Sequence, residues 1–156
     1  MDIYEYLKLD HQHVSKLFKQ FEKSNSKIRK QQIVKMICQE LLVHAHSEQD
    51  TFYKVLEQYQ TAEDEALHGE KEHREIEEQI NKVLKSKDFG SSWIEKVKKL
   101  KELVDHHVSE EEGKIFKKAK KVISDHEAMV IKEQMHYLKQ ELLLKMKKEG
   151  WAEDSF

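Results

Sequence analysis

Histidines and glutamates recur in two matching halves of the sequence, at a spacing that can hold metal ions. In each half, a lone histidine is followed one predicted helix later by a histidine and a glutamate that are four residues apart. Such a spacing places both side chains on one face of a helix, one turn apart. Four imidazoles and two carboxylates from four helices suit a pair of iron ions inside a bundle. The six residues are His11, His44, Glu48, His73, His107 and Glu111.

Taken singly, each of these residues has an ordinary explanation. A lone histidine is commonly a satisfied core or surface residue, and one His-x-x-x-Glu pair is commonly a contact on a helix surface. The duplication favours metal binding instead, because all six residues interrupt an apolar rhythm at positions that should face the core. A buried carboxylate without a partner is very costly. The six must therefore satisfy each other, hold water or bind metal.

The other histidines serve as an internal comparison, and we expect all of them at the surface or in a supporting position. His106 needs a separate argument, because His106 and Glu110 also have a spacing of four. The phase of the apolar stripe favours His107 and Glu111 as the inward pair. The remaining histidines are His13, His46, His68, His126 and His136.

The ligand types indicate which metal the site would hold. Imidazole and carboxylate without thiolate suit iron, manganese or zinc, and six ligands exceed the four of a structural zinc site. We predict two iron ions that are bridged by Glu48 and Glu111, with two histidines bound to each ion. Zinc or manganese can substitute, and bridging solvent would complete the coordination.

Composition predicts the elements that position these residues. The chain has 156 residues, no proline and four glycines, which favours long helices over sheets. Apolar periodicity and turn residues predict helices over 3–23, 27–59, 62–87, 93–121 and 125–149. The first four form an all-α, up-down-up-down four-helix bundle. The fifth, with an unbroken apolar stripe, is a structural element that packs alongside the bundle or extends its end. We expect one domain over 1–149, with a metal-binding core of about 10–121, and a short tail over 150–156.

Bulk properties argue against other classes of function. A net charge of −2 does not suggest a nucleic-acid partner, and no apolar run approaches the length of a membrane span. The N-terminal segment does not have the pattern of a signal peptide. The single cysteine, Cys38, reads as a small core residue, and a reduced cytoplasmic setting fits.

Several segments resemble the hemerythrin-like, HHE cation-binding family. The resemblance covers about 10–121, and the fifth helix resembles the extension of many bacterial members. It implies a non-haem di-iron centre in a four-helix bundle, with roles in binding oxygen or nitric oxide, or in sensing oxygen and iron. The matching segments are Asp10-His11, His44-Ala45-His46-Ser47-Glu48 with Phe52-Tyr53, Glu72-His73, and His107 to Glu112 with Phe116.

Two departures from the family pattern bear on function. Oxygen-carrying hemerythrins have two histidines four apart on the third helix, and the earlier position matches Gly69 here. Their fourth-helix carboxylate is an aspartate five residues after the histidine, where this chain has Glu112, one residue beyond Glu111. Both departures argue against simple reversible oxygen carriage.

We therefore expect a di-iron protein that binds or responds to oxygen, nitric oxide or iron, with no assigned catalytic residue. One alternative is a di-iron oxidase or peroxidase that acts on peroxide or a diatomic gas. Another is an interaction module in which metal serves only as a staple. The sequence does not identify a protein partner.

Overall fold

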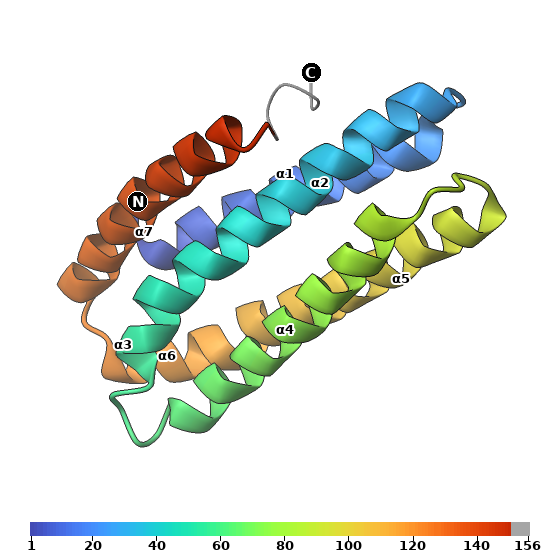
Figure 1. Cartoon of the computed structure of the whole chain (residues 1–156). Helices are drawn as coiled ribbons and strands as arrows, with labels where there is room; N and C mark the ends of the chain where they lie inside the picture. Colours follow the sequence, from blue (N-terminus) through green and yellow to red (C-terminus); the bar gives the residue numbers. More distant parts are fainter. Residues whose placement is uncertain (151–156) are drawn as a thin grey trace.

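Five long helical segments make up the computed structural model, which describes residues 1–150 (Figure 1). Each predicted helix is present, with ends that differ from the prediction by a few residues. The segments are α1 (Ile3–Lys23); α2 (Lys27–Glu48) continued by η1 (Gln49–Tyr53) and α3 (Lys54–Leu56); α4 (Glu63–Lys85); α5 (Ser91–Glu110) continued by η2 (Glu111–Ile115) and α6 (Phe116–Val122); and α7 (Asp125–Lys148). From residue 151 onward, the predicted tail lies outside the described residues.

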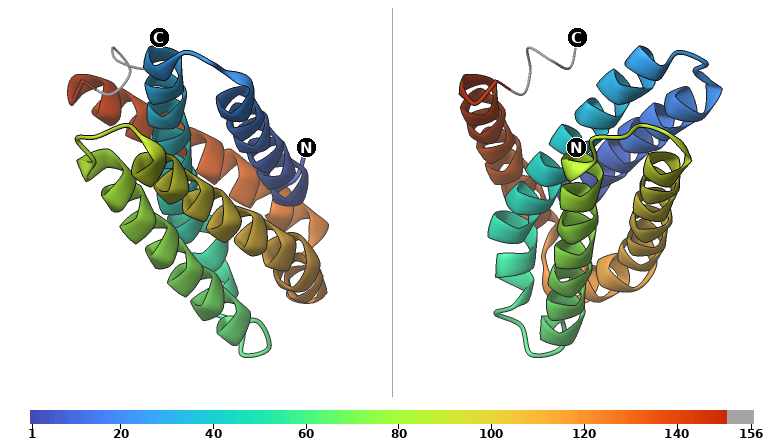
Figure 2. Two further views of the ribbon diagram at one scale, coloured as in Figure 1. Left: turned by 90° about the vertical axis from the view of Figure 1, so that its right-hand side faces the viewer. Right: turned by 45° about the vertical axis from the view of Figure 1, so that its right-hand side comes forward.

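The predicted up-down-up-down bundle is confirmed. Short turns join α1 to α2 and α4 to α5, so that each pair packs as an antiparallel hairpin, and α7 lies against α1 and α2 (Figures 1 and 2). Within residues 1–150, no helix combines the length and the apolar character needed to cross a membrane.

Side-chain caps fix three of the helix starts. Asp2 forms a capping box at α1, and the hydroxyls of Ser26 and Ser124 accept backbone N–H bonds at α2 and α7. The segment Ser92-Trp93-Ile94-Glu95 has the sequence pattern of a capping box and predicts a helix start at Ser92, which is wrong, because α5 begins at Ser91 after Gly90 without a side-chain cap.

The core consists of two hydrophobic clusters with a polar layer between them. One cluster contains Val14, Leu41, Ile76 and Val104, and the other contains Leu7, Phe52, Ala66 and Ile115. On every helix of the bundle, the polar residues of the predicted site lie between a member of one cluster and a member of the other. The site is therefore shielded by packed side chains at both ends.

Two π-helical segments, η1 and η2, were not predicted, and each begins directly at or after a glutamate of the site. A π turn holds one more residue than an α turn, so the apolar stripe advances by one residue beyond it. A regular α-helical stripe would continue the buried face from Phe52 to Val55 and Tyr59. These two side chains are half-buried, and Tyr53 and Leu56 are buried instead. Ile123 is likewise buried in place of Val122.

The stripe of α7 is also interrupted, contrary to prediction. Lys139 is buried, while the neighbouring Leu138 is half-buried. The fifth helix therefore brings a cation into the interior of the protein.

Candidate metal centre

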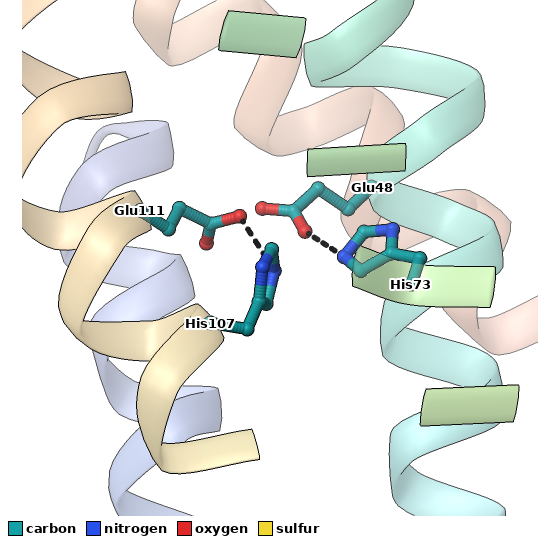
Figure 3. Close-up of side chains that lie close together, drawn as sticks. All are labelled: Glu48, His73, His107 and Glu111. Atoms are coloured by element: carbon teal, nitrogen blue, oxygen red, sulfur yellow. Dashed lines mark ion pairs between the residues drawn. The ribbon is translucent and has the colours of Figure 1, made fainter. Parts of the chain in front are cut away.

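The structure brings the six predicted site residues together in the polar layer. His11 comes from α1, His44 and Glu48 from α2, His73 from α4, and His107 and Glu111 from α5 and the start of η2. Both glutamates have no exposed side-chain area, and the side chains of all four histidines are at most 10% exposed. Figure 3 shows the two carboxylates pointing toward each other from opposite helices, with His73 and His107 beside them.

Each glutamate faces two imidazoles, all through the ring Nε2 atom. Glu48 Oε1 lies 3.1 Å from His73 and 3.5 Å from His44. Glu111 lies 3.2 Å from His11 through Oε1 and 3.3 Å from His107 through Oε2. The donor atoms form two groups that share Glu111: Glu48, His73, His107 and Glu111 in one, and His11, His44 and Glu111 in the other.

These contacts leave most of the inward-facing atoms without hydrogen bonds. In the described part of the chain, eight buried side-chain nitrogen or oxygen atoms lack a hydrogen-bond partner, and all but the Tyr4 hydroxyl belong to predicted ligands. A buried polar atom without a partner costs about 1–3 kcal/mol. Cations placed among these lone pairs would satisfy them, so the donor set fits metal.

A second tier of carboxylates holds three of the imidazoles. The Nδ1–H of His11 donates to Glu112 at 2.7 Å, that of His44 to Asp10 at 2.9 Å, and that of His107 to Glu72 at 2.8 Å. Such a bond fixes the tautomer and turns Nε2 toward the metal position. His73 differs, because neither of its ring nitrogens has a hydrogen bond.

We did not predict these supporting acids as site residues, although their positions in the sequence indicate them. Asp10 and Glu72 directly precede predicted ligands, and Glu112 directly follows one. Consecutive residues on a helix point in directions about 100° apart. An acid next to a ligand in the sequence therefore does not point into the centre, but it can contact the outer side of an imidazole from another helix.

Lys139 of α7 joins the same network. Its Nζ atom lies 2.8 Å from both carboxylate oxygens of Asp10, and Asp10 in turn binds His44. The fifth helix therefore contacts the centre through a chain of three side chains, and it is not only a packing element.

The metal-free centre has strongly shifted pKa values. Burial opposes protonation of His44 and His107, but the carboxylates around each ring overcome it and raise both pKa values to about 10. Burial prevails at His73 and lowers its pKa. Against the effect of burial, the facing imidazoles of His107 and His11 hold the pKa of Glu111 well below its usual value.

Tyr53 is a site residue that the stripe did not predict. Its ring stacks on His73 at a centroid distance of 5.1 Å, and its hydroxyl donates a hydrogen bond to Glu111. A Cβ atom built on Gly69 would lie 2.6 Å from that hydroxyl oxygen. The phenol of Tyr53 thus fills the space beside Gly69, the position at which oxygen-carrying hemerythrins have a second histidine.

A small cavity of about 30 Å³ adjoins the imidazoles. Its other walls are largely aliphatic and include Val14, Leu41, Ile76 and Val104. The volume is comparable to that of one water molecule. The centre therefore has room beside it for a ligand of very few atoms in apolar surroundings.

The six histidines expected outside the centre are all exposed. His106 turns away from it, as the stripe phase predicted, while His107 is buried. His13, His46, His126 and His136 contact none of the six site residues in the described chain. His68 is exposed, and its Nε2 atom lies 2.7 Å from Glu110.

Comparisons with known proteins agree with this geometry. The family model for the Hemerythrin HHE cation binding domain matches residues 2–119. A crystal structure of a Hemerythrin HHE cation binding domain-containing protein from Mycobacterium kansasii superposes with a TM-score of 0.83, covering 99% of this chain and 98% of that one at 22% identity. At that identity, the likeness supports the fold alone.

A second relative is a much longer protein than this chain. A protein from Nostoc sp. (strain PCC 7120) named "DNA nickase" is 28% identical over 118 residues, which are 74% of this chain. The chain spans only 33% of the length of that relative.

Proposed function

This chain belongs to the Hemerythrin HHE cation-binding domain family, and we propose that it is a non-haem di-iron protein that binds or responds to oxygen, nitric oxide or iron. The observation that carries the proposal is the set of unpaired inward atoms on His11, His44, Glu48, His73 and Glu111. Their buried, convergent lone pairs support metal binding, and the family supports a cation.

The choice of iron and the number of ions follow from the donor set. Imidazole nitrogen and carboxylate oxygen without sulfur suit iron, and the two donor groups around Glu111 suit two ions. We propose His11 and His44 as ligands of one ion, His73 and His107 as ligands of the other, and Glu48 and Glu111 as shared carboxylates. Iron held there would supply redox chemistry and an open position for a small ligand.

The protein residues around the ions would set how that position behaves. Asp10, Glu72 and Glu112 orient three of the imidazoles through Nδ1. The aliphatic wall of the adjoining cavity excludes bulk water and favours an uncharged, apolar ligand. The Nδ1 bonds support metal binding, and the apolar cavity supports a diatomic gas as the partner of the centre.

Metal analysis joined to optical spectroscopy tests this proposal. The protein, loaded anaerobically with ferrous iron and desalted, should retain at least about two irons per chain, the number that the six proposed ligands of the buried centre can hold. Exposure to oxygen or nitric oxide should then change its charge-transfer absorption. Glu48→Ala and His107→Ala should each lose at least one iron, while His13→Ala and His136→Ala, which alter exposed histidines, should keep the wild-type content.

A protein that retains only trace iron after reconstitution would refute the proposal. Equal metal loss in the buried and the exposed variants would refute the assignment of ligands. Iron retention without any response to either gas would favour the alternative in which metal only stabilises the fold.

The cavity also limits the enzymatic alternative. A space of about 30 Å³ has room for peroxide or a diatomic gas. If the protein is an oxidase or peroxidase, this cavity favours a substrate of very few atoms. Peroxide turnover that persists in His73→Ala would show that this centre does not perform it.

Partners and location follow from weaker observations. The activity named for the Nostoc relative belongs to a protein about three times as long, and the net charge of −2 does not suggest a DNA surface. We propose no nucleic-acid or membrane partner. The buried free thiol of Cys38 suits a reducing compartment, and we propose a cytoplasmic location.

A further inference from the structure

Two further His-x-x-x-Glu pairs meet on the outside of the bundle, where α4 packs against α5. His68 and Glu72 lie one turn apart on α4, and His106 and Glu110 lie one turn apart on α5. The two imidazoles are largely exposed, at 51% and 65% of their side-chain area, whereas Glu72 is 8% exposed. These four residues form an outer group that the buried centre does not use as ligands.

Donor atoms of His68, Glu72 and Glu110 lie close enough together to hold one ion, and His106 faces the same two carboxylates. His68 Nε2 is 3.4 Å from Glu72 Oε2 and 2.7 Å from Glu110 Oε2. His106 Nε2 is 3.3 Å from Glu72 Oε2 and 3.3 Å from Glu110 Oε1. Ligands about 2.1 Å from a tetrahedral zinc lie about 3.4 Å from each other. Three of the four separations agree with that value.

We propose that His68, Glu72 and Glu110, with His106 beside their carboxylates, form a second cation site, which takes a divalent transition metal ion from solvent. Imidazole and carboxylate are donors that zinc and ferrous iron accept, and two carboxylates balance the charge of a divalent ion.

Glu72 is held in place for this role by the buried centre. Its Oε1 atom accepts the Nδ1–H bond of His107 at 2.8 Å, while its Oε2 atom faces His68 and His106. One carboxylate oxygen thus serves the interior and the other serves the surface. Because the interior bond fixes the carboxylate, the outer oxygen is positioned before a cation arrives.

The sequence encodes both sites in neighbouring residues. His106 and Glu110 directly precede His107 and Glu111, and Glu72 directly precedes His73. A shift of one residue turns a side chain by about 100° around the helix, from the core to the flank that faces the adjacent helix. The pair His106 and Glu110 therefore lies on the outside of the bundle between α4 and α5, apart from the buried pair His107 and Glu111.

Zinc titration of the chelator-stripped protein tests the outer site. By calorimetry and by equilibrium dialysis with metal analysis, the double variant His68→Ala/His106→Ala should bind one zinc ion fewer per chain than the wild type. The matched control His46→Ala/His136→Ala also removes two exposed imidazoles and should bind as many ions as the wild type. Circular dichroism should show wild-type helicity for both.

A third variant separates the outer site from the proposed buried one. His11→Ala/His44→Ala alters the buried centre on the side away from Glu72 and should still bind the outer ion. Loss of the outer ion in this variant would overturn the proposal, as would wild-type stoichiometry in His68→Ala/His106→Ala. Because each site has its own variant, an absence of iron in the buried centre would not affect this test.

Discussion

We predict that replacing Gly69 with alanine destabilises the protein, because the ring of Tyr53 leaves no space for a side chain at residue 69. The added Cβ atom would lie 2.6 Å from the phenol oxygen of Tyr53 and 2.7 and 2.8 Å from two of its ring carbons. Carbon atoms in contact prefer about 3.5–4.0 Å, so the ring must move by roughly 1 Å. It has little freedom to do so, because it is fully buried, stacked on His73 and bonded to Glu111.

The expected cost combines three effects. Overpacking a core costs about 1–3 kcal/mol, and loss of a hydrogen bond to a charged acceptor costs about 1.5–3 kcal/mol. Alanine in place of glycine in a helix gains about 1 kcal/mol. We expect Gly69→Ala to destabilise the metal-free protein by about 2–4 kcal/mol on balance, where each kcal/mol lowers the Tm by about 2–4 °C for a chain of this size.

A double-mutant cycle in urea, followed by circular dichroism, measures this coupling. In a Tyr53→Leu background the phenol is absent, so Gly69→Ala should be neutral or stabilising by up to about 1 kcal/mol. Gly113→Ala is a matched control, because a Cβ atom there would meet nothing within 4 Å. If Gly69→Ala costs the same in both backgrounds, Tyr53 is not what excludes a side chain at residue 69.

Two further predictions concern the groups around the centre. Lys139→Met should destabilise the metal-free protein by about 3 kcal/mol, because it removes the ammonium group that contacts both oxygens of the largely buried Asp10 carboxylate. Lys132→Met on the same helix breaks a pair with an exposed glutamate and a 5.9 Å contact with the Tyr6 ring, and it should cost little because the pair faces solvent. Equal midpoints in urea for the two variants would contradict this view. In the metal-free protein, the folded-state pKa values of His44 and His107 are about 10, against an ordinary value of 6.5. Their contribution to stability is therefore fully present below pH 6.5 and is lost as the pH rises toward 10. The Tm of the metal-free protein should fall across this window, and a flat or rising Tm would exclude protonated imidazoles in the folded centre. The zinc-loaded protein, whose ligands are already deprotonated, should change less.

Local patterns were sufficient for much of the architecture. The rhythm of apolar residues fixed the five helical segments, and the phase of that rhythm separated His107, which is buried, from its exposed neighbour His106. Both features depend on the 3.6-residue turn of one helix. The same periodicity placed Val55 and Tyr59 in the core, which is wrong, because a regular 3.6-residue repeat does not include the additional residue of η1.

The sequence by itself determined that four imidazoles and two carboxylates would face the interior of a helical bundle, because each side chain's direction is set within its own helix. Only the tertiary structure decided how those helices are rotated and shifted against one another. That arrangement places Lys139 beside Asp10, lays the Tyr53 ring over Gly69, and joins His68 to Glu110 across two helices. Contacts between helices depend on crossing angles and on π turns, which respond to the packing of the whole core and leave no periodic trace in the sequence.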